Sequence, residues 1–142
     1  MKKILNVIVL LFLMFDAQAE IVVIGNKNNA LTLNSEQVED IFMGRNRALS
    51  NGSIAIPVDQ ANLRTEFYQK LLNSSVEKID AYWKMIELSN QVSSNKLSIQ
   101  QPPKILSSDI DVLNAVNANK DAIGYISRRY VNGNIRILLV ID

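Results

Sequence analysis

The sequence predicts an α/β fold, a mixed sheet flanked by helices, because strand-like and helix-like segments alternate along most of it. The clearest strand is the β-branched run over residues 21–24, which Gly25 stops. Such an uninterrupted apolar run is typical of a strand that is buried on both faces. The clearest helix begins after Asn34, which forms a capping-box pattern with Gln37, and Gly44 ends it. These two elements anchor the assignment of the others.

The elements that follow also alternate. A second strand is expected over residues 54–58, and its Pro57 places it at an edge of the sheet or at a strand end. A helix is expected to begin near Asn62, because apolar residues recur after it at helical spacing. The remaining expected elements are a helix opened by a Ser74–Glu77 capping box, a polar surface loop over 89–104, a helix that Ser108 caps through Asp111, and strands over 122–126 and 135–141.

Apolar stripes on two of these helices predict their inward faces. The stripe of the helix opened by Ser74 includes Trp83, the one tryptophan of the chain. At this spacing we expect Trp83 to anchor the core, the alternative being a platform for a ligand. The expected inward residues are Val76, Ile79, Tyr82, Trp83 and Ile86 on this helix, and Ile110, Leu113 and Val116 on the last helix.

The first 19 residues have the pattern of a cleavable secretory signal peptide. A basic start precedes an apolar run over residues 4–15 and an A-x-A cleavage motif at 17–19. The run is shorter than the roughly 20 apolar residues that cross a bilayer. We therefore expect a single mature domain of residues 20–142, free in the periplasm, with no transmembrane segment after cleavage. The alternative is an uncleaved N-terminal anchor.

Composition excludes several classes of function. The chain has fifteen basic and fourteen acidic side chains, and removing Lys2, Lys3 and Asp16 with the leader leaves thirteen of each. This balance gives no basic surface for a nucleic acid. The absence of Cys and His excludes a thiol nucleophile, a Ser–His triad and a zinc site of the usual ligands. We expect no catalytic residue, no metal and no cofactor, and therefore no enzyme.

The best candidate for a ligand site lies at the start of the second helix. Gln60, Asn62 and Arg64 combine amide donors, a fixed cation and a helix N-terminus, which together are typical of an anion site. The alternative is a plain helix start in which Arg64 forms a surface salt bridge with Glu66 or Asp59. For Asp59 itself we expect a solvated cap, the alternative being an acid or base.

A second candidate is the amide-rich loop after the first strand, which contains Asn26, Asn28 and Asn29. Open α/β sheets bind ligands at the carboxyl ends of their strands, so Asn28 and Asn29 are predicted to contact a ligand. The alternative is a plain turn. The run 128–130, Arg-Arg-Tyr, can meet an acidic partner or lipid headgroups, or can simply be solvated surface.

Several motifs occur together in one order along the chain. They are Leu33-x-x-x-Gln37-x-x-x-Ile41-Phe42-x-Gly44, Gly52-x-x-Ile-x-Pro57-Val58, Arg64-x-x-Phe67, Tyr82-Trp83 and Ala122-Ile123-Gly124-Tyr125-Ile126. In this arrangement the sequence resembles the phosphate-type periplasmic substrate-binding proteins of ABC transporters, above all their short, single-lobe relatives. The resemblance implies one lobe of a type-II periplasmic-binding-protein fold. It also implies an oxyanion site at residues 58–64, although the family's Ser-Gly-Thr turn is missing there and Asp59 stands near the position of its arginine.

Two functions follow as hypotheses. The first is a non-enzymatic periplasmic module that binds a small, phosphate-like oxyanion in a shallow polar cleft lined by loops 26–30 and 59–64. The second is an accessory subunit of an envelope assembly or sensor that has lost ligand binding and recognises an envelope protein. The second hypothesis predicts an exposed apolar patch and no convergent donors.

Overall fold

The computed structural model describes residues 20–29, 31–92 and 100–142. The predicted signal peptide, residues 1–19, lies outside the described residues, and so does the middle of the loop predicted over 89–104.

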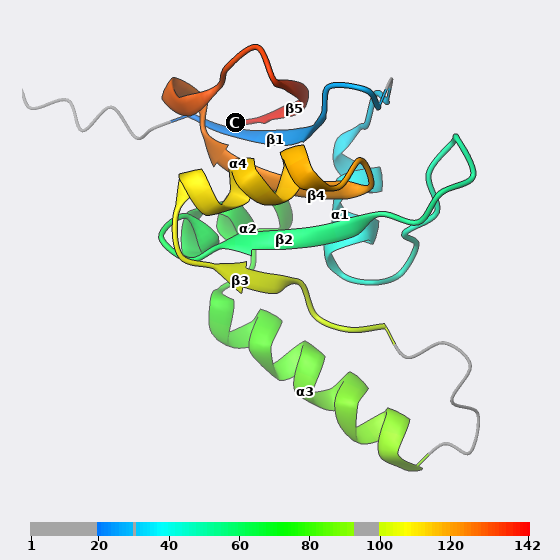
Figure 1. Ribbon diagram of the computed structural model, residues 1–142. Coiled ribbons are helices and arrows are strands. Elements are labelled where there is room, and N and C mark those ends of the chain that lie inside the picture. The colour runs from blue at the N-terminus through cyan, green and yellow to red at the C-terminus, as the bar shows by residue number, and fades with distance from the viewer. Residues whose placement is uncertain (1–19, 30, 93–99) are drawn as a thin grey trace, which may run out of the picture.

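Five strands form one mixed sheet in the order β3-β2-β4-β1-β5 (Figure 1). Strand β2 runs parallel to both β3 and β4, whereas β1 runs antiparallel to β4 and β5. The predicted mixed sheet is therefore confirmed. The strands are β1 (Ile21–Asn26), β2 (Ile56–Gln60), β3 (Lys104–Leu106), β4 (Ala122–Ser127) and β5 (Ile135–Ile141).

Helices cover both faces of the sheet. Figure 1 shows α4 on one face and α1 and α2 on the other, while α3 extends away beyond the β3 edge. The helices are α1 (Ser35–Phe42), α2 (Arg64–Leu72), α3 (Val76–Val92) and α4 (Asp109–Ala118), and a short 3-10 turn, η2 (Arg128–Tyr130), follows β4.

Strand β1 is buried along its whole length, as its sequence predicts. Its side chains alternate between two cores because successive residues of a strand point to opposite faces. Ile21 and Val23 join the larger core, which is formed with α1, α2 and α3. Val22 and Ile24 join the smaller core under α4. The buried strand therefore holds the two helical layers together.

The structure confirms two of the three predicted helix caps. Asn34 and Gln37 form the reciprocal capping box of α1, and the Ser108 hydroxyl accepts the N–H of Asp111 at the start of α4. At α3 the prediction was wrong by one residue. The Ser75 hydroxyl, and not that of Ser74, accepts a backbone N–H, at 3.3 Å from Lys78. Two successive serines leave the register of a cap ambiguous in sequence.

The polar loop predicted over 89–104 was wrong at both ends. Helix α3 continues to Val92, and β3 occupies Lys104–Leu106. The last turns of α3 are largely solvated and carry no apolar stripe toward the core, and the three-residue β3 depends on its pairing with β2. Pro57 belongs to an interior strand, but the pairing with β3 begins only at Val58. Of the two placements expected for Pro57, the strand end is therefore correct.

The inward face of α4 also differs in part from the prediction. Ile110 is 62% exposed, whereas Leu113 and Val116 are buried as expected, together with Val112. At 100° per residue these three share one arc of the helix, and Ile110 lies outside it. Trp83 is only 7% exposed and belongs to the larger core, which confirms its packing role.

Gly124, in the middle of the Ala-Ile-Gly-Tyr-Ile strand, lets α4 approach the sheet. A Cβ atom built at this position would lie 2.6 Å from Val112 Cγ1 and 2.8 Å from Val58 Cγ2. Both neighbours are buried side chains of the smaller core, so they have little room to move. The glycine of this motif is therefore explained by packing.

We predict that Gly124→Ala lowers the free energy of unfolding by about 1–3 kcal/mol, because the added methyl group overpacks the core. Gly133→Ala is the matched control, since a Cβ there meets no atom within 4 Å. Urea unfolding of both variants measures the difference. Equal stability of the two variants would show that the close packing of α4 on β4 is incorrect.

Candidate functional site

The candidate site is organised around Asp59, a carboxylate that is 1% exposed at the end of β2. Its Oδ1 accepts hydrogen bonds from the hydroxyls of Tyr68, at 2.9 Å, and Tyr125, at 3.0 Å. Its Oδ2 accepts a bond from Arg64 Nε at 3.1 Å. The predicted solvated cap was therefore wrong. Strand β2 extends two residues further than expected, which draws Asp59 into the protein.

The surroundings of Asp59 have opposing effects on its charge. Burial raises the pKa of Asp59, and the hydrogen bonds from Tyr68 and Arg64 partly offset this rise. Burial and the charge of Asp59 also raise the pKa values of Tyr68 and Tyr125, so both hydroxyls keep their protons. The two tyrosines are consequently fixed donors to Asp59.

Arg64 is held between two carboxylates. In addition to its bond to Asp59, its Nη2 donates to Asp80 Oδ1 at 2.7 Å, and its guanidinium carbon lies 5.6 Å from the centre of the Tyr68 ring. Although burial lowers the pKa of Arg64, the bonds to Asp80 and Asp59 raise it overall, so the side chain stays a cation. Of the two partners considered for a surface salt bridge of Arg64, Asp59 does pair with it, but as a buried carboxylate, whereas Glu66 pairs with Lys70.

Gln60 shapes the turn that leads into α2. Its side chain is 2% exposed, and its Oε1 accepts the backbone N–H groups of Asn62 and Leu63. Its Nε2 donates to Asp109 Oδ1 at 3.1 Å. Both the oxygen and the nitrogen of the Gln60 amide are therefore hydrogen-bonded within the protein. Asn62 is exposed beside it, with Nδ2 at 3.5 Å from the Ser107 carbonyl.

Backbone donors converge at the same place. No side chain caps α2 through its N-cap residue, Leu63, and the first turn of any helix has N–H groups without an intrahelical partner. Because β2, β3 and β4 are parallel, their carboxyl ends all lie at this end of the strands. Arg64 and Asn62 thus stand beside the positive end of a helix dipole, where an anion is stabilised.

Asn28 and Asn29 lie at the opposite end of the strands, near the start of β4. The Asn29 amide is buried and donates to the Lys120 carbonyl at 2.9 Å, and the exposed Asn28 donates its backbone N–H to Asn26 Oδ1. Lys120 precedes β4, whereas Gln60 lies at the level where β4 ends, so strand direction separates the two loops. The predicted single cleft lined by both loops was therefore wrong.

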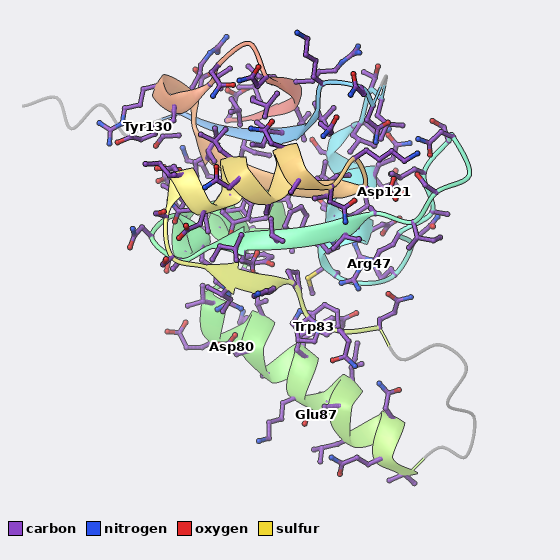
Figure 2. The ribbon with its side chains drawn as sticks, in the orientation of Figure 1. Arg47, Asp80, Trp83, Glu87, Asp121 and Tyr130 are labelled. Carbon is purple, nitrogen blue, oxygen red and sulfur yellow. The ribbon has the colours of Figure 1, made fainter. Side chains whose placement is uncertain are left out.

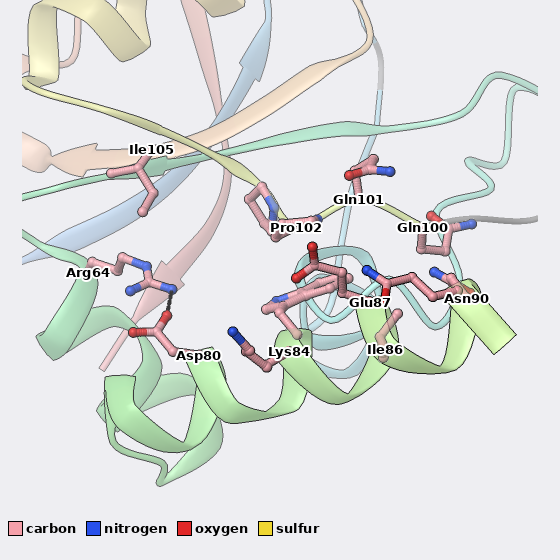
Figure 3. Close-up of a pocket in the computed structure, with 13 residues that line it drawn as sticks. Arg64, Asp80, Lys84, Ile86, Glu87, Asn90, Gln100, Gln101, Pro102 and Ile105 are labelled. Atoms are coloured by element: carbon pink, nitrogen blue, oxygen red, sulfur yellow. Dashed lines mark hydrogen bonds and ion pairs between the residues drawn. The ribbon is translucent and has the colours of Figure 1, made fainter.

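A groove between α3 and the extended segment 100–105 opens beside Arg64. Its volume is about 680 Å³, within the range of ligand pockets. Figure 3 shows Arg64 and Asp80 at one end of the groove and Gln100 at the other. The lining residues are Arg64, Asp80, Trp83, Lys84, Ile86, Glu87, Asn90, Gln91, Gln100, Gln101, Pro102, Pro103 and Ile105.

Arg47 fastens the extended wall of this groove to the rest of the protein. It donates to Gln100 Oε1 at 3.1 Å and to the Gln101 carbonyl at 2.7 Å. Its guanidinium lies 5.7 Å from the Trp83 ring, on the side of α3 that faces the sheet (Figure 2). The role of this arginine has no local signal in the sequence, because Gln100 and Gln101 lie more than fifty residues further along the chain.

The arrangement offers a fixed cation and hydrogen-bond donors for the recognition of charge. Within the described residues no three side chains of the types that bind metals gather closely enough to hold an ion. A search of residues 20–29, 31–92 and 100–142 likewise finds no helix with both the length and the apolar character needed to cross a bilayer.

We predict that Asp59→Asn removes a pH dependence of stability. Because burial raises the pKa of Asp59, the folded protein binds this proton more tightly than the unfolded chain. The resulting stability is complete below the unfolded pKa, about 3.9, and is lost as the pH rises through the folded value. Urea unfolding between pH 4 and pH 7 should show wild-type stability falling relative to the variant. A constant difference would contradict this assignment.

Comparison with known proteins finds relatives in structure alone. No protein-family model matches the chain, and no curated protein matches it in sequence. A Clostridium perfringens protein, solved with bound phosphate and assigned to the substrate-binding proteins of phosphate ABC transporters, superposes with a TM-score of 0.60 at 20% identity. An ABC-type phosphate transport receptor from Vibrio cholerae superposes with a TM-score of 0.60 at 17% identity.

Each of these matches covers 84% of this chain. In return, the chain covers 44% of the first protein and 45% of the second, so it spans less than half of their length. At these identities the likeness establishes the fold alone. The expected fold class is confirmed: the chain has the α/β fold of one part of a phosphate-type periplasmic binding protein.

Proposed function

We propose that this chain is a non-enzymatic binding module of the periplasm that takes a small oxyanion at Asn62, Arg64 and the first turn of α2. The observation that carries the proposal is the position of Arg64. Its guanidinium is fixed by a buried carboxylate beside the N-terminus of a helix, at the carboxyl edge of parallel strands. Open α/β sheets bind their ligands at such an edge.

The donors that remain free at the site indicate the kind of ligand that it can bind. Asp59 and Asp80 occupy Arg64 Nε and one N–H of Nη2, which leaves the second N–H of Nη2 and both N–H groups of Nη1 for a ligand. The exposed Asn62 amide and the backbone N–H groups of the first turn of α2 are further donors at the same helix start. A few converging donors of this kind suit an ion with several oxygens, and phosphate-binding structures that share the fold support this class.

The other predicted ligand residues have different parts in this proposal. Gln60 holds the turn through its bonds to Asn62 and Leu63, so it positions donors without contacting the ion. Asn28 and Asn29 lie at the far end of the strands and take no part in this site. The periplasmic location follows from the predicted signal peptide, residues 1–19, and agrees with the transport role of the proteins that share the fold.

One observation favours the second function, an accessory subunit with an envelope partner. The outer face of α3 carries an exposed apolar stripe at one-turn spacing, with Met85 70% exposed, Leu88 51% and Val92 89%. Exposed apolar patches mark interaction surfaces. The measurement that separates the two functions is direct titration with anions, because the accessory function requires no anion site.

We predict saturable binding of a small oxyanion, measured by calorimetry at low salt with phosphate, sulfate and nitrate. Arg64→Gln, which keeps a donor for Asp59 but removes the charge, should weaken the binding at least about tenfold, the loss expected for a charge-assisted hydrogen bond. Lys70→Gln removes an equal charge from the other end of α2 and should leave the affinity unchanged. The absence of heat with every anion would refute the oxyanion site and favour the accessory function.

A further inference from the structure

We infer that Asp80 determines which anions the Arg64 site accepts, and that it restricts the site to monovalent oxyanions. The inference rests on the proposed oxyanion site and adds to it a residue from another helix. Asp80 lies on α3, and its carboxylate is already bound to the guanidinium that a ligand would approach (Figure 3). Asp80 therefore already occupies an N–H group of Arg64 that an anion could otherwise bind.

The two carboxylates on Arg64 differ in their freedom to move. Asp59 is 1% exposed and accepts three hydrogen bonds, so it cannot leave the guanidinium without stranding two tyrosine hydroxyls. The Asp80 side chain is 62% exposed, and Arg64 is its partner at 2.7 Å. An incoming anion can therefore displace Asp80 from the guanidinium but not Asp59.

Charge around the guanidinium decides which anions can enter. One arginine faces two carboxylates, and Asp109 and Asp111 at the first turn of α4 add further negative charge to the same sheet edge. Repulsion scales with the charge of the ligand, so a dianion meets twice the penalty of a monoanion. Asp80 is the nearest of these groups outside the core, and so contributes most of the penalty that a mutation can remove.

Lys84 places a second cation in the groove beside Asp80. It lies one helical turn after Asp80 on the same face of α3, and both residues line the groove together with Arg64. Figure 3 shows the Lys84 side chain entering the groove next to Asp80. Arg64 and Lys84 both line this end of the groove, while Glu87 lies about two turns of α3 further from Asp80. With Asp80 neutralised, the local charge therefore becomes more favourable to a dianion.

The test compares Asp80→Asn with wild type by calorimetric titration of sulfate, a dianion, and nitrate, a monoanion, at pH 7 and low salt. We expect Asp80→Asn to raise the affinity for sulfate at least about tenfold and to change that for nitrate by less than about threefold. Glu77→Gln is the matched control, since it removes an exposed carboxylate one turn earlier on α3 and should change neither affinity. Far-ultraviolet circular dichroism verifies that each variant is folded.

The outcomes separate the failure of this inference from the failure of the oxyanion site. Nitrate binding by wild type, with no gain of sulfate affinity in Asp80→Asn, overturns the role of Asp80 and leaves the site standing. If Asp80→Asn binds sulfate while wild type binds neither anion, the result supports the blocking role of Asp80 and overturns the proposed function of the wild-type protein. No binding of either anion by either protein overturns both.

Discussion

The buried carboxylate of Asp59 is the constraint on which the candidate site depends. A charge in a protein interior must be paired and hydrogen-bonded, because an isolated buried charge costs several kcal/mol, on the order of 3–5 when one partner of a pair is removed. Asp59 meets this demand with Tyr68 and Arg64 from α2 and Tyr125 from β4. Its bonds therefore fix how α2 packs on the sheet, and they orient the guanidinium of Arg64.

This arrangement links stability to recognition. Arg64 cannot adopt another rotamer without leaving Asp59 unpaired, so its outer nitrogens are held in place before any ligand arrives. Such preorganisation reduces the cost of ordering a side chain on binding. The same arrangement limits the strength of the site, because the nearest carboxylates already compensate the guanidinium.

Sequence predicted the features that have local causes. The burial of β1 follows from an unbroken apolar run, and the cap of α1 follows from Asn34 and Gln37. Features that arise from tertiary contacts were missed. Asp80 reaches Arg64 from another helix, and Tyr125 reaches Asp59 across 66 residues. Asn28 and Asn29 were placed in the same cleft as Arg64 because a strand's residues do not reveal its direction in the sheet.

The central claim is that Asp59 holds Arg64 rigidly while the outer nitrogens of Arg64 remain available to an anion. Arginine side-chain NMR tests it most directly, by following the Nε–Hε and Nη–Hη signals of Arg64 during titration with nitrate. We expect a slowly exchanging Hε signal that persists throughout the titration, with saturable shifts confined to the Nη signals. An Hε that exchanges as fast as those of the exposed Arg128 and Arg129, or Nη signals that do not respond, would contradict it.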